Sequence, residues 1–196
     1  MKLVLASASP TRRRLLAEAG IDAEARPAPI DERATEAPLL RAGATPRDIA
    51  VALASAKALA ASEAAPAALV IGADQTLDLD GERMTKPSDM DAAGQQLLRL
   101  SGRSHKLHSA VACARDGTIL WQHVESPTLT MRKLAPDDIA RYLAAVGEDA
   151  LSSVGAYQLE GRGIRLFERI DGDFFAILGL PLLPLLAFLR SQKVVE

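Results

Sequence analysis

Hydroxyl and guanidinium side chains gather just after the first apolar run of the chain. Residues 7–13 read Ser-Ala-Ser-Pro-Thr-Arg-Arg and follow the apolar residues 3–6. Ser9 is a typical N-cap and Pro10 suits the first helical position, so we predict that a helix begins here. Free N–H groups at a helix N-terminus attract anions, and arginine forks match phosphate oxygens. The segment predicts a phosphate site, with an incidental charged turn as the alternative; its candidate binding residues are Ser7, Ser9, Arg12 and Arg13.

An aspartate follows an apolar run that is typical of a buried strand. Residues 69–71 are Leu-Val-Ile, and Gly72-Ala73 then place Asp74 at the predicted carboxyl end of this strand. In open α/β sheets, ligands bind beyond the carboxyl ends of the strands. A β-hairpin over residues 76–85, turning at an Asp-Gly pair, would return Lys86 to Asp74. The two groups are therefore either a catalytic pair or a buried carboxylate neutralised by one lysine.

These groups together suit phosphoryl chemistry. Carboxylates hold a divalent cation and orient or deprotonate water, while Arg and Lys neutralise charge on the phosphoryl oxygens. Glu32 follows Ile30-Asp31 in a predicted polar loop and is a candidate second acid, with a solvated loop as the alternative. The expected reaction is cleavage of a phosphoanhydride.

Cysteine and histidine usage limits the choice of metal. The one cysteine, Cys113, excludes an internal disulfide, and the three histidines lack the spacing of a zinc site. We expect His105 and His108, on an alternating strand, to lie at the surface. A metal ion here should be a hard divalent cation, Mg²⁺ or Mn²⁺, held by carboxylates and phosphates.

A different phosphoryl-transfer motif overlaps the predicted hairpin. Residues 78–81 read Asp-Leu-Asp-Gly, which is similar to the D-x-D-G signature of aspartyl-phosphate phosphatases. In that interpretation Asp78 would be the nucleophile. However, Glu82 stands where that signature expects a hydroxyl residue, and Asp80-Gly81 suits a two-residue hairpin turn. We therefore favour the hairpin.

The elements that position these groups alternate along the first half of the chain, and strands cluster in its middle. This pattern predicts a mixed α/β fold. Lys57 lies on an Ala-rich helix, where a lone lysine is typical of a surface group. Pro127 lies within a predicted strand, so that strand should be an edge strand or carry a bulge. We predict strands over residues 2–6, 104–114, 118–131 and 164–170, and helices over residues 10–19, 46–65, 88–100, 136–146 and from 181 onward.

Composition limits the broad class of protein. A length of 196 residues suits one domain, residues 1–196. The net charge of −2, with both signs interspersed, argues against a nucleic-acid surface. The apolar run before Ser7 is too short for a signal peptide, and the uncharged stretch 174–189 contains a glycine and two prolines and is too short to span a membrane. We expect a cytoplasmic protein without membrane or nucleic-acid partners.

Several short motifs, spread in order over nearly the whole chain, resemble the Maf family of nucleoside triphosphate pyrophosphatases. The resemblance implies an elongated mixed sheet flanked by helices, akin to inosine triphosphate pyrophosphatases, with two lobes around a cleft and a homodimeric assembly. It also implies hydrolysis between the α and β phosphates with a divalent metal, which keeps modified nucleotides out of nucleic acids. The motifs are Ser7-Ala8-Ser9-Pro10-x-Arg12-Arg13-x-Leu15-Leu16, Gly72-Ala73-Asp74, Lys86-Pro87, Leu100-Ser101-Gly102-Arg103, Gly155-Ala156-Tyr157, Glu160-Gly161 and Gly179-Leu180-Pro181.

The resemblance also implies roles for individual residues. Asp74 matches the acid that acts as general base or anchors the metal-bound water, and Glu32 matches the second acid near the metal. Lys57 matches the family's lysine on the helix that precedes the Asp74 strand, and this match makes it a candidate catalytic residue rather than a surface group. The phosphate-site positions are matched by Ser7, Arg12 and Lys86.

Departures from the commoner family pattern bear on the nucleotide base. Thr11, Gln75 and Glu160, with Phe167-Glu168-Arg169, resemble the branch that acts on 7-methyl-GTP, although that branch often has an aromatic residue in place of Thr11. Gln75 and Glu160 are thus candidate substrate-binding residues. Glu160 would accept hydrogen bonds from guanine N1–H and the amino group, and its charge favours a cationic methylated purine. The alternatives are a dTTP/UTP pyrophosphatase and a nucleotide-binding regulator of cell division without turnover.

Overall fold

The computed structural model describes residues 2–196 and is built on one mixed sheet. Along the main path, the strand order is β2-β1-β3-β5-β7-β8, with β4 paired to β3 and β6 paired to β5. The strands of the described chain are β1 (Leu3–Leu5), β2 (Glu24–Ala25), β3 (Leu69–Leu79), β4 (Glu82–Met84), β5 (Ser104–Arg115), β6 (Thr118–Glu125), β7 (Thr128–Met131) and β8 (Phe167–Asp171). The predicted mixed α/β class is confirmed.

The helices begin where the sequence places caps and prolines. Ser9 caps α1 through its Oγ. Thr45 caps α3: its Oγ1 accepts from Asp48 N, and the Asp48 carboxylate accepts from Thr45 N in return. Pro127 divides the predicted strand 118–131 into β6 and β7, and short 3₁₀ helices over Gly147–Ser152, Val154–Ala156 and Arg162–Leu166 lie between α5 and β8. The helices are α1 (Pro10–Glu18), α2 (Glu32–Arg41), α3 (Pro46–Glu63), α4 (Met90–Leu100), α5 (Pro136–Val146), α6 (Phe174–Ile177) and α7 (Leu182–Ser191).

Helix α2 and the single-turn helix α6 were not predicted. Glu32 lies at the first position of α2 rather than in a loop, and Asp31 caps the helix by accepting from Ala34 N at 3.0 Å. Pro38 lies inside α2, and the helix buries no apolar stripe. Both features hide a helix from sequence patterns, because a proline and a missing stripe normally argue against one.

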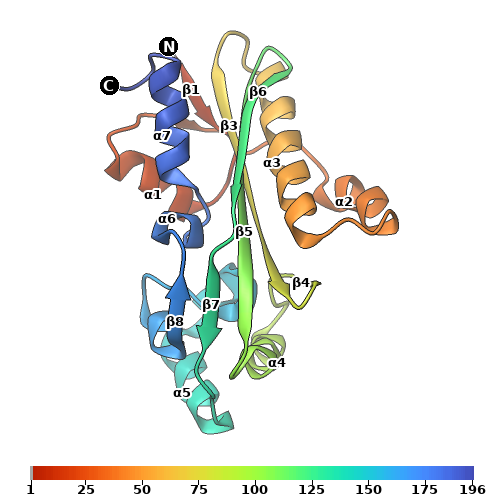
Figure 1. The fold of residues 1–196 in the computed structure, drawn as a ribbon, viewed down its shortest axis with the longest axis vertical. Helices are drawn as coiled ribbons and strands as arrows, with labels where there is room; N and C mark the ends of the chain where they lie inside the picture. The colour runs from red at the N-terminus through yellow and green to blue at the C-terminus, as the bar shows by residue number, and fades with distance from the viewer. Residues whose placement is uncertain (1) are drawn as a thin grey trace.

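The molecule is elongated because β3 and β5 pair antiparallel along most of their length (Figure 1). Helices α1, α3 and α7 lie around one end, and α4 and α5 lie around the other, while α2 projects to the side (Figure 1). On its outer edge β3 pairs with β1 over Leu69–Ile71 and with β4 over Leu77–Leu79. Two lobes therefore share the central strand pair.

Asp74 lies in the middle of β3 and not at its carboxyl end. The apolar run predicted a strand that stops near Ile71, but β3 pairs with β5 residue by residue from Val70 to Asp78. The element that ends near Asp74 is β1, whose last strand residue, Leu5, pairs with Ile71. Residues 72–76 of β3 thus have a strand on one edge only, between the ends of β1 and β4.

Small residues bring α3 very close to the sheet. Ala50, Ala54 and Ala58 pack on alanines of β5. A Cβ atom on Gly72 would lie 2.2 Å from the Ala54 carbonyl oxygen and 2.6 Å from the Ala58 nitrogen. Both distances are shorter than any van der Waals contact, so Gly72 permits a separation between α3 and β3 that no larger residue allows.

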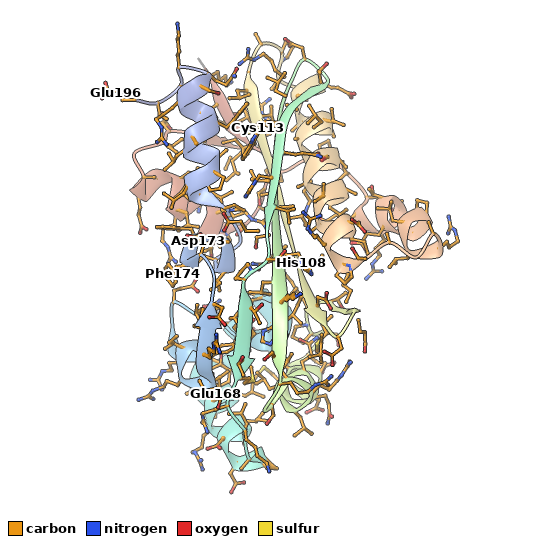
Figure 2. All side chains as sticks on the ribbon, viewed as in Figure 1. His108, Cys113, Glu168, Asp173, Phe174 and Glu196 are labelled. Atoms are coloured by element: carbon orange, nitrogen blue, oxygen red, sulfur yellow. The ribbon has the colours of Figure 1, made fainter. Side chains whose placement is uncertain are left out.

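The prediction that His105 and His108 are surface residues is wrong. Both are buried. His105 lies on the inner face at the start of β5, where the outer face is still exposed at Ser104 and Lys106. From Leu107 onward both faces of β5 are covered, and this buries His108. Figure 2 shows His108 near the middle of the molecule. His105 Nε2 shares a 2.6 Å hydrogen bond with the Tyr157 hydroxyl. Burial lowers the pKa of His105 to about 4.

No helix within residues 2–196 has the length and apolar character needed to cross a membrane. The uncharged stretch 174–189 instead forms α6, a turn at Gly179 and most of α7, as the glycine and prolines predict.

His105 should make stability fall in mild acid. The folded state disfavours the imidazolium, whereas an unfolded chain binds the proton with a pKa near 6.5, so stability is lost as the pH falls from about 6.5 toward about 4. Between pH 7 and pH 5 the loss should be about 2 kcal/mol. Urea unfolding at both pH values should show this loss reduced in His105→Gln, which keeps a polar side chain but does not titrate. Equal losses in the two proteins would contradict this role.

Candidate active site

The unpaired edge of β3 is covered by the segment that follows β1. Ala6 N donates to the Ile71 carbonyl at 2.8 Å, and the chain then turns into α1. From the first turn of α1, Arg12 Nη1 donates to the Ala73 carbonyl at 2.9 Å and to Ser7 Oγ at 3.2 Å. A guanidinium group thus takes the place of a neighbouring strand beside Asp74.

Arg12 is buried and held from a third side. Its Nε donates to the Gly179 carbonyl at 2.8 Å, in the turn between α6 and α7. Gly179 has φ +98, and a Cβ there would lie 3.5 Å from the Arg12 Nε, so glycine suits this turn on both counts. Burial lowers the pKa of the Arg12 guanidinium, and Asp74 and Glu32 oppose that shift. Because arginine stays protonated in proteins, Arg12 is a fixed cation at this point.

The two serines of the predicted phosphate segment differ in their contacts. Ser9 Oγ accepts from Arg12 N at 3.3 Å, which is the N-cap bond of α1. Ser7 Oγ accepts from Ser9 N at 3.2 Å and from Arg12, and Ser7 is buried. Ser7 therefore joins the loop to the guanidinium, while Ser9 orders the helix N-terminus.

Lys57 bridges two carboxylates on the face of β3 that α3 covers. Its Nζ lies 2.7 Å from Asp74 Oδ1 and 2.8 Å from Glu32 Oε1. The side chains of Lys57 and Asp74 are 12% and 11% exposed, whereas that of Glu32 is 51% exposed, so the cluster opens to solvent on the α2 side. The helical pattern alone placed Lys57 at the surface, and the structure places it in this cluster.

Burial raises the pKa of the Asp74 carboxyl above its ordinary value, while Lys57 and Arg12 oppose the rise. A carboxylate whose pKa is raised is a stronger base. Asp74 is thus suited to accept a proton from water.

The two carboxylates fit a hard cation only in part. Asp74 Oδ1 and Glu32 Oε1 both contact Lys57 Nζ, so each carboxylate has its other oxygen left to offer a cation. A third carboxylate is lacking: among residues 2–196 no group of three or more His, Cys, Asp or Glu side chains is arranged to hold a metal ion. Mg²⁺ commonly uses one or two carboxylates together with substrate phosphates and water. These donors therefore suit a cation that arrives with a phosphate ligand.

Two predicted site residues lie away from this cluster. The hairpin forms as predicted, with Leu77 opposite Met84 and positive φ at Asp80 and Gly81, but its pairing ends at Met84 and Lys86 beyond it is exposed. The cation beside Asp74 is thus Lys57 and not Lys86. Arg13 lines a cavity of about 480 Å³ on another side of α1, together with Gly20, Ile21 and Asp22.

Gln75 faces the opposite side of the sheet from Asp74, as strand alternation requires. Its Nε2 donates to Ser109 Oγ at 2.7 Å and to the carbonyls of Ala176 and Ile177 at 3.2 and 3.0 Å. Gln75 thus fastens α6 to the central strands. Figure 2 labels Asp173 and Phe174 at the start of α6, beside the middle of the sheet.

Glu160 extends from the second lobe toward α1. Its Oε1 lies 3.4 Å from Arg14 Nη2, two residues beyond Arg12 on α1. This contact links the two lobes through α1, on a different side of the helix from the buried Arg12, because residues two apart on a helix do not face the same way. Sequence reasoning missed Arg14, because a third consecutive arginine on an exposed helix carries no signal of its partner.

The Asp78 side chain is used by the hairpin. Oδ1 accepts from Gly81 N at 2.6 Å, and Oδ2 lies 3.1 Å from His108 Nε2. Both contacts support the hairpin interpretation of residues 78–81 over a free nucleophile.

Comparisons with known proteins agree over the full length. A family model described as Maf-like protein matches residues 2–192. The chain is 58% identical over 196 residues to a 7-methyl-GTP pyrophosphatase of Brucella abortus, covering 100% of this chain and 98% of that protein. It is 56% identical over 195 residues to a 7-methyl-GTP pyrophosphatase of Mesorhizobium japonicum, with the same coverage. It is 49% identical over 195 residues to a nucleoside triphosphate pyrophosphatase of Granulibacter bethesdensis, covering 100% and 99%.

A solved structure was also matched. A nucleoside-triphosphatase / dITP/XTP pyrophosphatase from Mycobacterium abscessus has a TM-score of 0.41 and 19% identity, over 74% of this chain and 94% of that chain.

Gly72→Ala should disturb the cluster without changing any charged group. The new Cβ must push α3 off β3, and overpacking of this kind costs about 1–3 kcal/mol. Because α3 carries Lys57, the Lys57–Asp74 contact should lengthen and turnover should fall by about 10². Gly94→Ala, within α4, is the matched control, because its Cβ would lie an ordinary 3.7 Å from Leu143 of α5. Wild-type turnover in Gly72→Ala would show that the close approach of α3 is not needed.

Proposed function

The chain belongs to the Maf family, and from that premise we propose that it hydrolyses the α–β phosphoanhydride of a nucleoside triphosphate to a nucleoside monophosphate and pyrophosphate. The observation that carries this proposal is the convergence of a buried guanidinium and the Asp74–Lys57–Glu32 cluster on one unpaired stretch of β3. A fixed cation and a buried base at one point are what hydrolysis of a polyanion requires.

The start of α1 is suited to hold the phosphates. Arg12 and Ser7 lie at the N-terminal end of α1, where backbone N–H groups and the helix dipole favour negative charge. Lys86 follows the hairpin, and in the proposal it contacts the outer phosphates from solvent. Arg13 remains a candidate only if its exposed side chain turns toward this end of α1.

Asp74 is the proposed general base. Lys57 contacts its Oδ1, and among the described residues Oδ2 has no hydrogen-bond partner, so this oxygen is available to take a proton from the attacking water. The water oxygen then bonds to phosphorus, and the bond between phosphorus and the bridging oxygen breaks. The departing phosphate oxygen gains negative charge, which Arg12 and Lys57 stabilise.

Mg²⁺ or Mn²⁺, when bound, would neutralise phosphate charge. Asp74 and Glu32 are the residues that would hold the ion. Lys57 keeps the two carboxylates close together, which limits their mutual repulsion.

The proposed base is 7-methylguanine. The relatives from Brucella abortus and Mesorhizobium japonicum bear the name 7-methyl-GTP pyrophosphatase, and the Glu160 carboxylate of the second lobe lies against Arg14 of α1. A carboxylate accepts from N1–H and the amino group of guanine and favours the positive charge of the methylated ring. The role of Gln75 becomes indirect, because it faces α6. Homodimer formation and a cytoplasmic location stay predictions.

Asp74→Asn should abolish most turnover. The amide keeps the shape of the side chain but cannot accept the proton, so kcat should fall by at least about 10². Pyrophosphate release from a nucleoside triphosphate with Mg²⁺ measures this loss. Near-normal release would reject Asp74 as the base.

Asp78→Asn distinguishes the phosphatase alternative, in which this variant would lose activity and the wild type would release inorganic phosphate. A protein that binds triphosphate without releasing pyrophosphate would be the regulator instead.

Glu160→Gln should change the choice of base. Removal of the negative charge weakens binding of a cationic purine and allows the amide to pair with uracil or thymine. The ratio of kcat/KM for 7-methyl-GTP to that for UTP or dTTP should therefore fall. Unchanged ratios in a panel of nucleotides would remove Glu160 from base recognition.

A further inference from the structure

The helix that carries Glu32 is attached to the molecule in an unusual way. Glu36 is the one buried residue of α2, all ten of whose residues are described, and Leu40 is 52% exposed. Helices of this length are marginal alone and normally owe their stability to a buried apolar face. α2 lacks that face and projects from the side of the molecule (Figure 1). Its apolar residues Ala37 and Leu39 are only half-buried, so polar contacts must supply much of what fixes its position.

One contact is a bidentate ion pair to the other lobe. Arg83 Nη1 and Nη2 lie 2.5 and 2.7 Å from the two carboxylate oxygens of Glu36. The side chains of Arg83 and Glu36 are 20% and 11% exposed, so the pair is largely shielded from water. Paired forks of this kind fix orientation as well as distance. Loss of one partner would leave a buried charge without compensation, which is strongly unfavourable.

The Glu36–Arg83 pair has the same arrangement as the Glu32–Lys57 contact, four residues further along both α2 and β3. Glu32 and Glu36 are four residues apart and share a face of α2, and Asp74 and Asp78 are four residues apart and share a face of β3. Glu32 meets Lys57 beside Asp74, and Glu36 meets Arg83, which is paired with Asp78 across the hairpin. The face of α2 that carries Glu32 and Glu36 therefore runs alongside the face of β3 that carries Asp74 and Asp78.

We propose that Glu36 and Arg83 are positioning residues, whose ion pair holds α2 so that Glu32 reaches Lys57 beside Asp74. The role in catalysis rests on the proposed function, but the docking of α2 does not. Because Arg83 belongs to the hairpin that leads into Lys86, the same pair links the placement of Glu32 to the segment that precedes Lys86. Without it, α2 would keep only its half-buried apolar residues and the contact of the half-exposed Glu32 with Lys57.

Hydrogen exchange measured by mass spectrometry tests the docking directly. In Arg83→Met the amides of residues 32–41 should exchange at least about tenfold faster, while those of α3 and β3 keep wild-type rates, because only α2 is released. Arg83→Lys keeps the charge but not the fork, and should give an intermediate rate. Glu36→Gln gives the same test if Arg83→Met does not fold. The matched control is Glu82→Gln, which breaks an exposed 2.6 Å pair to Arg99 from the neighbouring position of β4 and should change no rate in α2.

A double-mutant cycle tests the link to catalysis. If the pair acts through Glu32, Arg83→Met should lower kcat/KM by at least about tenfold, and adding it to Glu32→Gln should lower kcat/KM no further. Additive losses, unchanged α2 exchange in Arg83→Met, or equal exchange in Arg83→Lys and Arg83→Met would each overturn the proposal. If the wild type releases no pyrophosphate, the proposed function fails, and the exchange rates still decide whether the pair docks α2.

Discussion

The structure depends on how the free edge of β3 is satisfied. Backbone carbonyls buried in a protein need hydrogen-bond donors, and between β1 and β4 no strand of the described chain supplies them to this edge. The Arg12 guanidinium does so at Ala73, and in the same step it places a fixed positive charge next to Asp74. The hydrogen bond to the Ala73 carbonyl thus brings the N-terminus of α1, which attracts anions, close to Asp74, the acid best suited to act as a base.

Close packing from the other face completes the arrangement. Gly72 allows α3 to approach β3 so nearly that Lys57 reaches both Asp74 and Glu32. On the opposite face Gln75 and Arg12 hold the segment that returns from the second lobe, through the carbonyls of Ile177 and Gly179. The site therefore lies where both lobes, both faces of the sheet and an open edge meet, and a shift of either lobe changes it.

Local signals predicted much of this from the sequence. The cap at Ser9-Pro10 and the Asp80-Gly81 turn depend on nearby residues, and both formed as expected. Features set by distant partners were not predictable. The run of β3 through Asp74 follows from pairing with β5, and the burial of His105 follows from its contact with the distant Tyr157. In the same way α2 is held by Arg83 across more than forty residues. For the same reason Lys57, and not Lys86, is the cation beside Asp74.

A crystal structure of the protein with a nucleoside triphosphate whose α–β bridging oxygen is replaced by an imido group would locate the reacting bond directly. The account predicts that the phosphates lie at the open edge of β3, with Arg12 on one side and the Lys57–Asp74 pair on the other. Phosphates bound elsewhere, such as in the cavity lined by Arg13 and Asp22, with the β3 edge unoccupied, would contradict it.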